Sequence, residues 1–405
     1  MSFEDRTLVA PARGREAAFA LDEVFFSRTD GRGVIQAGNT VFARVAKYPM
    51  EELIGAPHKL IRHPDMPRGV FQLFWDTIKS GATVGAYVKN QASDGSYYWV
   101  FAVVTPCDGG YLSARIKPTS ALLKTVEQEY TRLRQAEQAE ELSPEDSAAR
   151  LLARLQELGF ATYNDFAGHA LAEELLTRDA GLNRAADPRL AERRTMHSTA
   201  GKLVEETEAL VQEFESMRTI PHNLRVIASR IEPAGGPVTV LSENYNAMSR
   251  DMSNWFEAHV WGKNSNFRAI KGTVTAAIFV EGLARILTEC GHQLEKEDAA
   301  AETDIAREQA ILQQLTEDQF SKARASLLEV RVEAGRIQKA CLTLHRHFMA
   351  LTTTRVLCKI ECARLGNVGE SLNSIIDELG QFQDRISERL EKITELSAVL
   401  ASEEK

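Results

Sequence analysis

The sequence predicts an α+β domain with an antiparallel sheet and covering helices, followed by an all-α region of long antiparallel coiled-coil-like hairpins. Between residues 21 and 117, short runs rich in β-branched and aromatic residues alternate with glycine-containing turns. From residue 118 onward, apolar residues recur at helical spacing and the strand signals stop. A chain of 405 residues can hold two or three domains that each bury a core.

A β-hairpin is expected after an N-terminal extension of residues 1–20. Residues 24–28 and 34–37 are short apolar-rich runs. Asp30 and Gly31 between them form a pair that is typical of a tight hairpin turn. We therefore expect the first domain, residues 21–117, to begin with two antiparallel strands.

Helices are expected after this hairpin. Two short ones lie near residues 40–47 and 49–54, and a longer one begins after Pro67 and ends at Gly81. The apolar residues of the longer helix fall on one stripe, formed by Val70, Phe71, Phe74, Trp75 and Ile78. This stripe predicts that the helix packs against the sheet.

Three further strands complete the predicted sheet. They lie at residues 84–91, 96–105 and 110–117, separated by glycine turns at residues 93–95 and 107–109. In the central strand both alternating sets of side chains are apolar. One face of the sheet therefore needs the helices of the domain, and the other face needs a second partner surface.

The all-α region starts with a helical connector, residues 118–190, and continues as two hairpins. In the first hairpin, residues 191–262, apolar residues are spaced seven apart and the turn falls at residues 233–237. In the second, longer hairpin, residues 263–405, the turn falls at residues 366–369. The apolar seams include Leu203, Leu210, Met217, Tyr245 and Met252 in the first hairpin and Val330, Ile337, Leu344, Leu379, Ile386 and Ile393 in the second.

Composition restricts the partners and the compartment. The 48 Lys and Arg residues against 57 Asp and Glu residues give a net charge of −9, which argues against nucleic acid or an anionic membrane surface as the main partner. The best candidate for a membrane span, residues 274–287, is interrupted by Glu281 and Arg285. The five cysteines are an odd number at irregular spacing. We therefore expect a cytoplasmic protein with reduced thiols and protein partners.

The sequence does not predict an enzyme. It contains no Walker loop, Gly-x-Ser-x-Gly elbow, dinucleotide fingerprint or kinase ATP-site motif. Cys341, Cys358 and Cys362 lie on apolar seams, where a buried thiol acts as a small hydrophobic group. His345 and His347 point to different faces of their helix. We therefore expect neither catalysis nor a metal site.

The most informative motif is the segment at residues 58–67, His-Lys-Leu-Ile-Arg-His-Pro-Asp-Met-Pro. Its two prolines restrict the backbone while Arg62, His63 and Asp65 project from a loop between apolar segments. This arrangement suits the binding of an anionic or hydrogen-bonding ligand. The motif therefore favours a sensor over a catalyst.

This segment, the Val-Lys-Asn run at residues 88–90 and the run at residues 94–100 closely resemble the PAS domain of bacterial aerotaxis receptors. In that family the domain binds FAD, whose redox state reports on electron transport. The resemblance covers about a quarter of the chain and implies a redox or oxygen sensor for energy taxis. It implies that the flavin is contacted or supported by Arg62, His63, Asp65 and Asn90, with His58 and Trp75 close by.

One position departs from the pattern of that family. The family commonly has a Pro-Trp pair shortly before the Val-Lys-Asn run, whereas this chain has Thr83 and Val84. If that tryptophan stacks on the ligand, its loss weakens or alters cofactor binding. The fold is therefore predicted more firmly than the cofactor.

The same residues also have structural interpretations. His63 could cap the long helix, and Asn90 could satisfy backbone groups of a strand or turn. Trp75 and Trp99 could be core residues. Heme, with His58 or His63 as axial ligand, is a minor alternative to FAD. A PAS domain without a cofactor, joined to a helical scaffold, is a further alternative.

The predicted hairpins are similar to the cytoplasmic signalling region of methyl-accepting chemotaxis proteins. Residues 360–366, Ile-Glu-Cys-Ala-Arg-Leu-Gly, resemble the hairpin-tip motif of that family, which contacts the chemotaxis kinase and its coupling protein. Residues 231–236 look like a degraded copy of the same motif. Both segments depart from the family pattern. The resemblance implies a homodimer with the chemotaxis histidine kinase and the coupling protein as partners.

Overall fold

The computed structural model describes residues 14–185, 187–217, 225–226, 229, 236–261, 266–296, 304–364 and 369–402. The chain divides into two compact units. Unit 1 comprises residues 1–191 and 275–324, and unit 2 comprises residues 192–274 and 325–405. The predicted limits of the connector and hairpins stay predictions, but residues 275–324, expected in the second hairpin, belong to the unit that contains the sheet.

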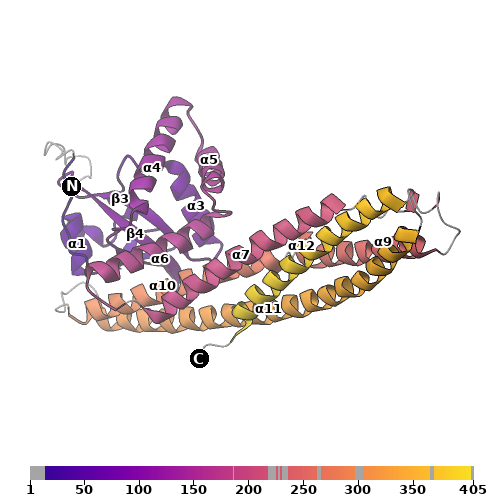
Figure 1. Ribbon diagram of the computed structural model, residues 1–405. Coiled ribbons are helices and arrows are strands. Elements are labelled where there is room, and N and C mark those ends of the chain that lie inside the picture. Colours follow the sequence, from indigo (N-terminus) through magenta and orange to yellow (C-terminus); the bar gives the residue numbers. More distant parts are fainter. Residues whose placement is uncertain are drawn as a thin grey trace. The chain divides into compact units, whose positions relative to one another are not determined.

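A five-stranded antiparallel sheet lies at the centre of unit 1 (Figure 1). Its strands are β1 (Phe25–Asp30), β2 (Ile35–Gly38), β3 (Val84–Gln91), β4 (Tyr97–Cys107) and β5 (Gly110–Ile116). Their order across the sheet is β2-β1-β5-β4-β3. The five predicted strands are confirmed, with ends that differ by at most two residues.

Short helices from the same segment cover one face of the sheet, called here the inner face. They are α1 (Thr40–Ala46), α2 (Met50–Leu53), η1 (His58–Ile61) and α3 (Arg68–Lys79). Alternation along β4 sends every second side chain to this face. These side chains belong to a buried cluster that includes Phe25, Val41, Val45, Tyr98, Val100 and Ala102.

Helices that come later in the chain cover the outer face of the sheet. They are α4 (Leu122–Ala139), α6 (Tyr163–Gly181), α10 (Asn266–Leu294) and the first part of α11 (Ile305–Arg364). A further helix, α5 (Pro144–Glu157), packs against α3. The second partner surface that the apolar sheet requires is therefore supplied by this chain itself.

Three contacts illustrate how the outer face is covered. The hydroxyl of Tyr163 in α6 donates a hydrogen bond to the carbonyl oxygen of Gly85 at 3.1 Å. The ring of Phe279 in α10 lies against the same glycine, where an added Cβ would be only 2.6 Å from the ring. Arg28 of β1 forms a bidentate ion pair with Glu308 of α11, at N–O distances of 2.7–3.0 Å. Small, aromatic and charged side chains thus anchor three separate helices.

Unit 2 consists mainly of long helices. They are α7 (Pro188–Met217), α9 (Pro237–Phe256), the later part of α11 and α12 (Gly369–Ala401), with a π-helical turn, η2 (Glu257–Trp261), after α9. The predicted seams are largely buried, as at Leu203, Leu210, Tyr245, Met252, Val330, Ile337, Leu344, Leu379, Ile386 and Ile393. The long coiled-coil-like helices are therefore confirmed.

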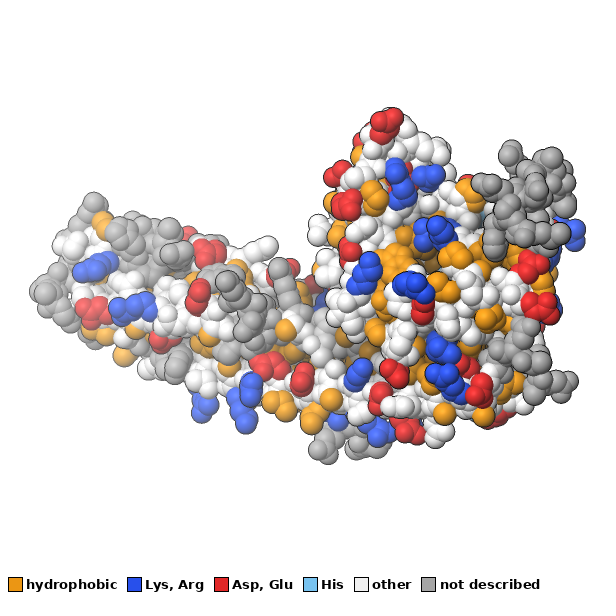
Figure 2. All heavy atoms as spheres, turned by 180° about the vertical axis from the view of Figure 1, so that it is seen from behind, with side chains coloured by type: hydrophobic (Ala, Val, Ile, Leu, Met, Phe, Trp, Pro, Cys, Tyr) orange, Lys and Arg blue, Asp and Glu red, His pale blue; other side chains and the backbone are white. Residues whose placement is uncertain are grey.

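Ion pairs connect neighbouring helices of unit 2. Lys359 of α11 contacts Asp377 of α12 at 2.6 Å, and Arg389 of α12 contacts Glu206 of α7 at 2.7 Å. Residues 233–235 of the first predicted hairpin turn and residues 366–368 of the second lie outside the described residues. Among the helices that are described, none combines the length and apolar character needed to cross a membrane. Figure 2 shows acidic and basic side chains interspersed on the visible face.

Candidate functional site

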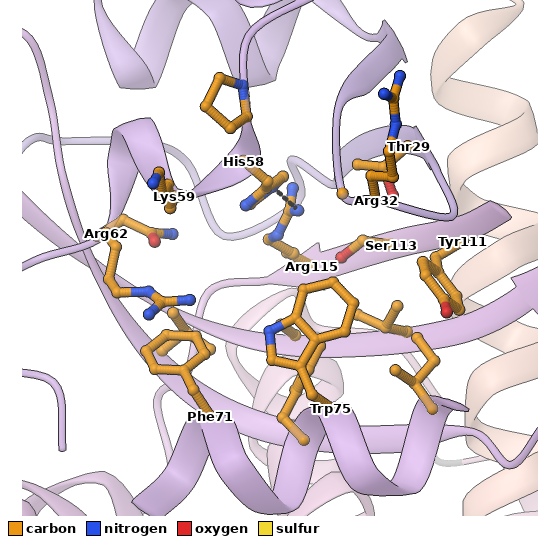
Figure 3. A pocket seen from close by; sticks show the side chains of 18 residues that line it. Thr29, Arg32, His58, Lys59, Arg62, Phe71, Trp75, Tyr111, Ser113 and Arg115 are labelled. Carbon is orange, nitrogen blue, oxygen red and sulfur yellow. Dashed lines mark hydrogen bonds between the residues drawn. The ribbon is translucent and has the colours of Figure 1, made fainter. Parts of the chain in front are cut away.

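A cavity of about 330 Å³ lies between the inner face of the sheet and helix α3 (Figure 3). Ala102 and Val104 of β4 contribute small apolar side chains to it, and Phe71 and Trp75 of α3 form a wall. Its volume is within the range of small-molecule sites in proteins. The amphipathic stripe predicted for the long helix therefore lines a ligand-sized space as well as packing on the sheet.

The turn between β1 and β2 closes the cavity beside Trp75. Gly33 in this turn has a φ of 80°, a left-handed conformation that favours glycine. An added Cβ at Gly33 would lie 3.2 Å from Cη2 of Trp75. Glycine is therefore suited to both the backbone conformation and the close approach of the indole.

Four of the six predicted site residues line this cavity. They are His58, Arg62, Trp75 and Asn90. The guanidinium of Arg62 stacks over the ring of Phe71, with Cζ 3.4 Å from the ring centroid. Backbone pairing between Arg62 and Asn90 joins the motif segment to β3. The structure thus brings together residues that are far apart in the sequence.

The other two predicted residues, His63 and Asp65, do not line the cavity. The Asp65 carboxylate accepts a hydrogen bond from Lys89 Nζ at 2.7 Å, and His63 Nδ1 accepts one from the backbone N–H of Asp65 at 3.1 Å. Asp65 faces a separate hollow of about 420 Å³, bordered by α4. These two residues therefore fix the loop against β3, which is a supporting position.

The structural alternatives have different outcomes. His63 does not cap α3, because the backbone N–H groups of Arg68 and Gly69 donate instead to Glu137 of α4, at 2.6 and 3.2 Å. Trp99 is a core residue, since it is buried on the outer face against Tyr130. Trp75 instead borders the cavity, where its edge contacts Tyr111.

Sequence reasoning missed the residues that β5 contributes. Tyr111, Ser113 and Arg115 alternate along this strand and all three line the cavity. Arg115 is only 3% exposed. Its Nη2 atom donates to Ser27 Oγ at 2.9 Å and contacts His58 Nε2 at 2.5 Å. The period-two alternation of polar residues in this strand is the signal that could have identified them.

Three polar atoms of cavity-lining residues are buried and have no hydrogen-bond partner among the described residues. They are Asn90 Nδ2, Ser113 Oγ and Arg115 Nη1. Most buried polar groups in proteins are paired, so each exception needs an explanation. Two of these atoms are donors and the hydroxyl can donate or accept. The residues therefore fit a planar polar heterocycle that offers carbonyl oxygens and ring nitrogens.

The cavity has a positive electrostatic character. Among the described residues, the side chains that line it include Arg32, Lys59, Arg62 and Arg115 and no carboxylate. Burial and the two neighbouring guanidiniums, Arg115 and Arg62, lower the pKa of His58 well below its usual range. His58 is therefore neutral at pH 7, and its Nε2 can accept the hydrogen bond from Arg115. Burial lowers the pKa of Arg115 to about 10, which leaves it charged at pH 7.

The comparison with protein families identifies the fold around this cavity. Residues 38–111 match the PAS fold. This segment is a PAS domain. The match begins at the end of β2 and extends to the start of β5, so it includes the motif at residues 58–67 and most of the cavity. The expectation of a PAS domain is confirmed.

Two curated proteins are similar to the PAS region. The aerotaxis receptor of Escherichia coli (strain K12) is 38% identical over 117 residues, which cover 28% of this chain and 23% of the receptor. The nitrogen fixation regulatory protein of Klebsiella pneumoniae is 31% identical over 83 residues, which cover 20% of this chain and 17% of that protein. The chain therefore matches about a quarter of the first relative's length and about a sixth of the second.

A solved structure of a fungal LOV domain photoreceptor is also similar, at 15% identity and a TM-score of 0.21. The similarity covers 26% of this chain and 81% of that chain. The similarities to the three proteins are confined to about a quarter of this chain or less.

Heme is not supported as the ligand of the PAS domain. Nε2 of His58 is occupied by the hydrogen bond with Arg115, and its ring is stacked parallel to that of Phe42. His63 does not line the cavity. Of the two histidines considered as axial ligands, His58 therefore already uses its Nε2 atom and His63 lies away from the cavity.

Proposed function

We propose that this protein is a PAS-domain sensor that binds FAD in the cavity and relays the redox state of the flavin through its helices. The observation that carries the proposal is the set of three buried, unpartnered polar atoms, on Asn90, Ser113 and Arg115, beside a cationic cavity of about 330 Å³. A flavin ring offers acceptors to such atoms. The similarity of the PAS region to an aerotaxis receptor agrees with this ligand.

The residues have distinct roles in this proposal. Asn90, Ser113 and Arg115 hold the flavin ring, and Trp75 and Phe71 enclose it. Arg32 and Lys59 at the border of the cavity are suited to the diphosphate, because guanidinium and ammonium groups bind phosphate oxygens well. When bound, the flavin supplies reversible electron transfer. Arg62 and His58 are placed to respond to a change of charge on the ring.

Two buried carboxylates support a route from the cavity to the helical region. Glu137 of α4 caps α3, the helix that carries the aromatic wall of the cavity. Glu174 of α6 accepts a hydrogen bond from Tyr87 on the outer face of β3. A shift of α3 or of the sheet is therefore transmitted to α4 and α6 through short, buried hydrogen bonds.

We further propose that the output is an interaction with a chemotaxis-type signalling assembly, formed by a homodimer of this chain with a chemotaxis histidine kinase and a coupling protein. The support for these partners is the resemblance of residues 360–366 to a chemoreceptor tip motif. Pull-down of the full chain with a purified kinase and coupling protein tests it. A double variant of the full chain, Ile360→Asp with Ala363→Asp, should no longer pull down the kinase and the coupling protein.

The first experiment is a visible absorption spectrum of the purified protein, before and after addition of dithionite. A flavin spectrum that bleaches on reduction supports the proposal. Asn90→Ala and Arg62→Ala should each lower the bound flavin by at least about tenfold, because each removes a cavity contact worth roughly 1.5–3 kcal/mol. Arg44→Met, on the exposed side of α1, is the control and should retain flavin.

The absence of a chromophore, even after incubation with FAD, contradicts the proposal. Such a result, together with strong self-association of the full chain, favours the alternative that the PAS domain is a cofactor-free part of a helical scaffold. Full flavin occupancy in the Asn90→Ala and Arg62→Ala double variant would leave FAD in place but reject the residues assigned to it.

A further inference from the structure

Arg115 is a charged residue in an unusual position. It lies on the inner face of β5, is 3% exposed and forms no ion pair with a carboxylate among the described residues. Its partners in the register of the sheet are Phe25 on β1 and Ala102 on β4, and both of these neighbours are apolar. An uncompensated buried charge destabilises a folded protein. A purely structural role does not account for this guanidinium.

The hydrogen bonds of Arg115 hold it in one orientation. Nη2 donates a hydrogen bond to Ser27 Oγ at 2.9 Å and lies 2.5 Å from His58 Nε2. Figure 3 shows the contact between Arg115 and His58. The His58 ring is itself fixed by parallel stacking on Phe42, with ring centroids 6.0 Å apart. Nη1 is left buried without a partner among the described residues. The guanidinium is therefore preorganised, with one donor group available to a ligand in the cavity.

Arg115 also differs from the other cations of the cavity. Arg62 is exposed and stacks on Phe71, and Arg32 is 86% exposed and pairs with Asp30. Those two lie where solvent can screen their charge. Arg115, in contrast, is buried, and it is paired in the sheet register with Ala102 on the neighbouring strand β4. Its field therefore acts on the deepest part of a ligand and not on a solvent-exposed tail.

We propose that Arg115 is the anchor of the ligand ring, and that it binds a carbonyl oxygen or a negatively charged ring atom of a planar heterocycle. This inference rests on the proposed function, because the ring is taken to be that of the flavin. The ligand supplies the acceptor and the negative charge density that the folded chain lacks at this position. The cavity accordingly favours rings that carry an acceptor at their buried edge.

The test uses the full chain with the variants Arg115→Met and Arg115→Lys, and with Arg44→Met as a control for loss of an arginine elsewhere in the domain. Dissociation constants are measured by flavin fluorescence for FAD and for riboflavin, which lacks the phosphates. We expect Arg115→Met to weaken both ligands at least about thirtyfold, by the same factor. Arg115→Lys should recover part of the loss, and Arg44→Met should remain within about threefold of the wild type.

A melting curve of the ligand-free protein separates this role from a structural one. An arginine kept for binding leaves a destabilising charge in the free protein, so Arg115→Met should melt cooperatively at or above the wild-type temperature. A lower melting temperature with unchanged riboflavin affinity would overturn the inference. Loss of FAD affinity alone, with riboflavin unaffected, would also overturn it, because the contact would then be to phosphate.

The two proposals fail in different ways. If the wild type binds neither FAD nor riboflavin, the proposed function is rejected, and the assignment of Arg115 to a flavin ring is rejected with it. If the wild type binds both ligands and Arg115→Met binds them equally well, only the role of Arg115 is rejected. If Arg115→Met does not fold, the dissociation constants of Arg115→Lys and wild type are compared instead. Lysine preserves the charge but not the fixed fork of donors, so equal affinity for both ligands would reject the role of Arg115.

Discussion

The hydroxyl of Tyr87, on the outer face of β3, donates a hydrogen bond of 2.6 Å to the buried carboxylate of Glu174 in α6. The same carboxylate accepts hydrogen bonds from the backbone N–H groups of Thr119 and Ser120 and from the Ser120 hydroxyl, at 2.6–3.0 Å. Thr119 and Ser120 lie between the last strand and α4. One carboxylate thus joins the sheet, the exit from the PAS domain and α6.

Replacing Tyr87 by Phe removes one of these donors while preserving the aromatic packing. We expect the free energy of unfolding of the full chain to fall by about 1–3 kcal/mol, because the buried carboxylate loses a hydrogen bond. FAD affinity should be unchanged, since Tyr87 lies on the face of β3 opposite to the cavity. Urea denaturation and a flavin titration measure the two quantities. Tyr130→Phe, which removes a bond to a backbone carbonyl, is the milder comparison.

Glu137 is the second carboxylate that links the PAS domain to the helices. Its Oε1 accepts hydrogen bonds from the backbone N–H groups of Arg68 and Gly69 and from the Ser147 hydroxyl. Glu137→Ala removes the acceptor that these three donors share, so we expect a loss of about 2–3 kcal/mol of stability. FAD affinity should fall as well, because α3 carries the cavity wall. Urea denaturation and flavin titration test both effects.

A matched control for that variant is available on the same helix end. Glu140 is exposed and pairs with Arg150. Glu140→Ala should change stability by no more than about 1 kcal/mol, as is usual for exposed ion pairs. Equal losses for the two variants would show that Glu137 does not act as the cap of α3.

A substitution at Gly85 of β3 probes how closely α10 packs on the outer face of the sheet. An added Cβ would lie 2.6 Å from the Phe279 ring, so Gly85→Ala forces α10 and β3 apart. We expect a loss of about 1–3 kcal/mol, measured by thermal or urea unfolding. Gly291→Ala, in the same helix with open space at Cβ, should be neutral or stabilise by up to about 1 kcal/mol. An unaffected Gly85→Ala protein would mean that α10 does not pack there.

His58 makes the stability of the PAS domain depend on pH. Burial and the charges of Arg115 and Arg62 lower its pKa in the folded chain well below the value near 6.5 that it has when unfolded. Between these two pKa values the unfolded chain binds more protons, so stability falls as the pH drops below about 6.5. His58→Gln should lack this contribution. The free energy of unfolding of His58→Gln, relative to that of the wild type, should therefore increase steadily as the pH falls from 7 to 5.

The measurement for this prediction is the free energy of unfolding of both proteins across that pH range. The slope assigned to one proton cannot exceed about 1.4 kcal/mol per pH unit. His63, whose pKa is also lowered by burial, is present in both proteins, so its contribution cancels in the difference. A difference that does not vary with pH would mean that His58 titrates normally in the folded chain.

The sheet was predictable from the sequence because local signals determine it. The Asp30-Gly31 pair, the glycine turns and the period-two patterns fix the strands to within two residues. His58, Arg62, Trp75 and Asn90 were found because a family motif contains them. Arg115 was not found, because a charged residue in a strand is normally expected on an exposed face. Only its position two and four residues after Ser113 and Tyr111 in the same strand indicates that Arg115 shares their face of the sheet and lines the cavity.

The covering of the outer face was not predictable in the same way. The sequence indicates that the face needs a partner, but many apolar helices satisfy that condition. The observed partner includes residues near Phe279 and Glu308, which the heptad pattern placed in a separate hairpin. Hydrophobic periodicity identifies the face of a helix that is buried but not the surface that buries it.

This arrangement has a consequence for synthesis of the protein. All five strands have been translated by Ile116, whereas Phe279 and Glu308 follow about 160 and 190 residues later. At translation rates of ~5–20 residues per second, the interval is roughly 10–40 s. During that time the apolar outer face of the nascent sheet lacks two of its four covering helices, α10 and α11. Part of an apolar sheet face therefore stays uncovered during this interval, and exposed apolar surface of this kind favours aggregation.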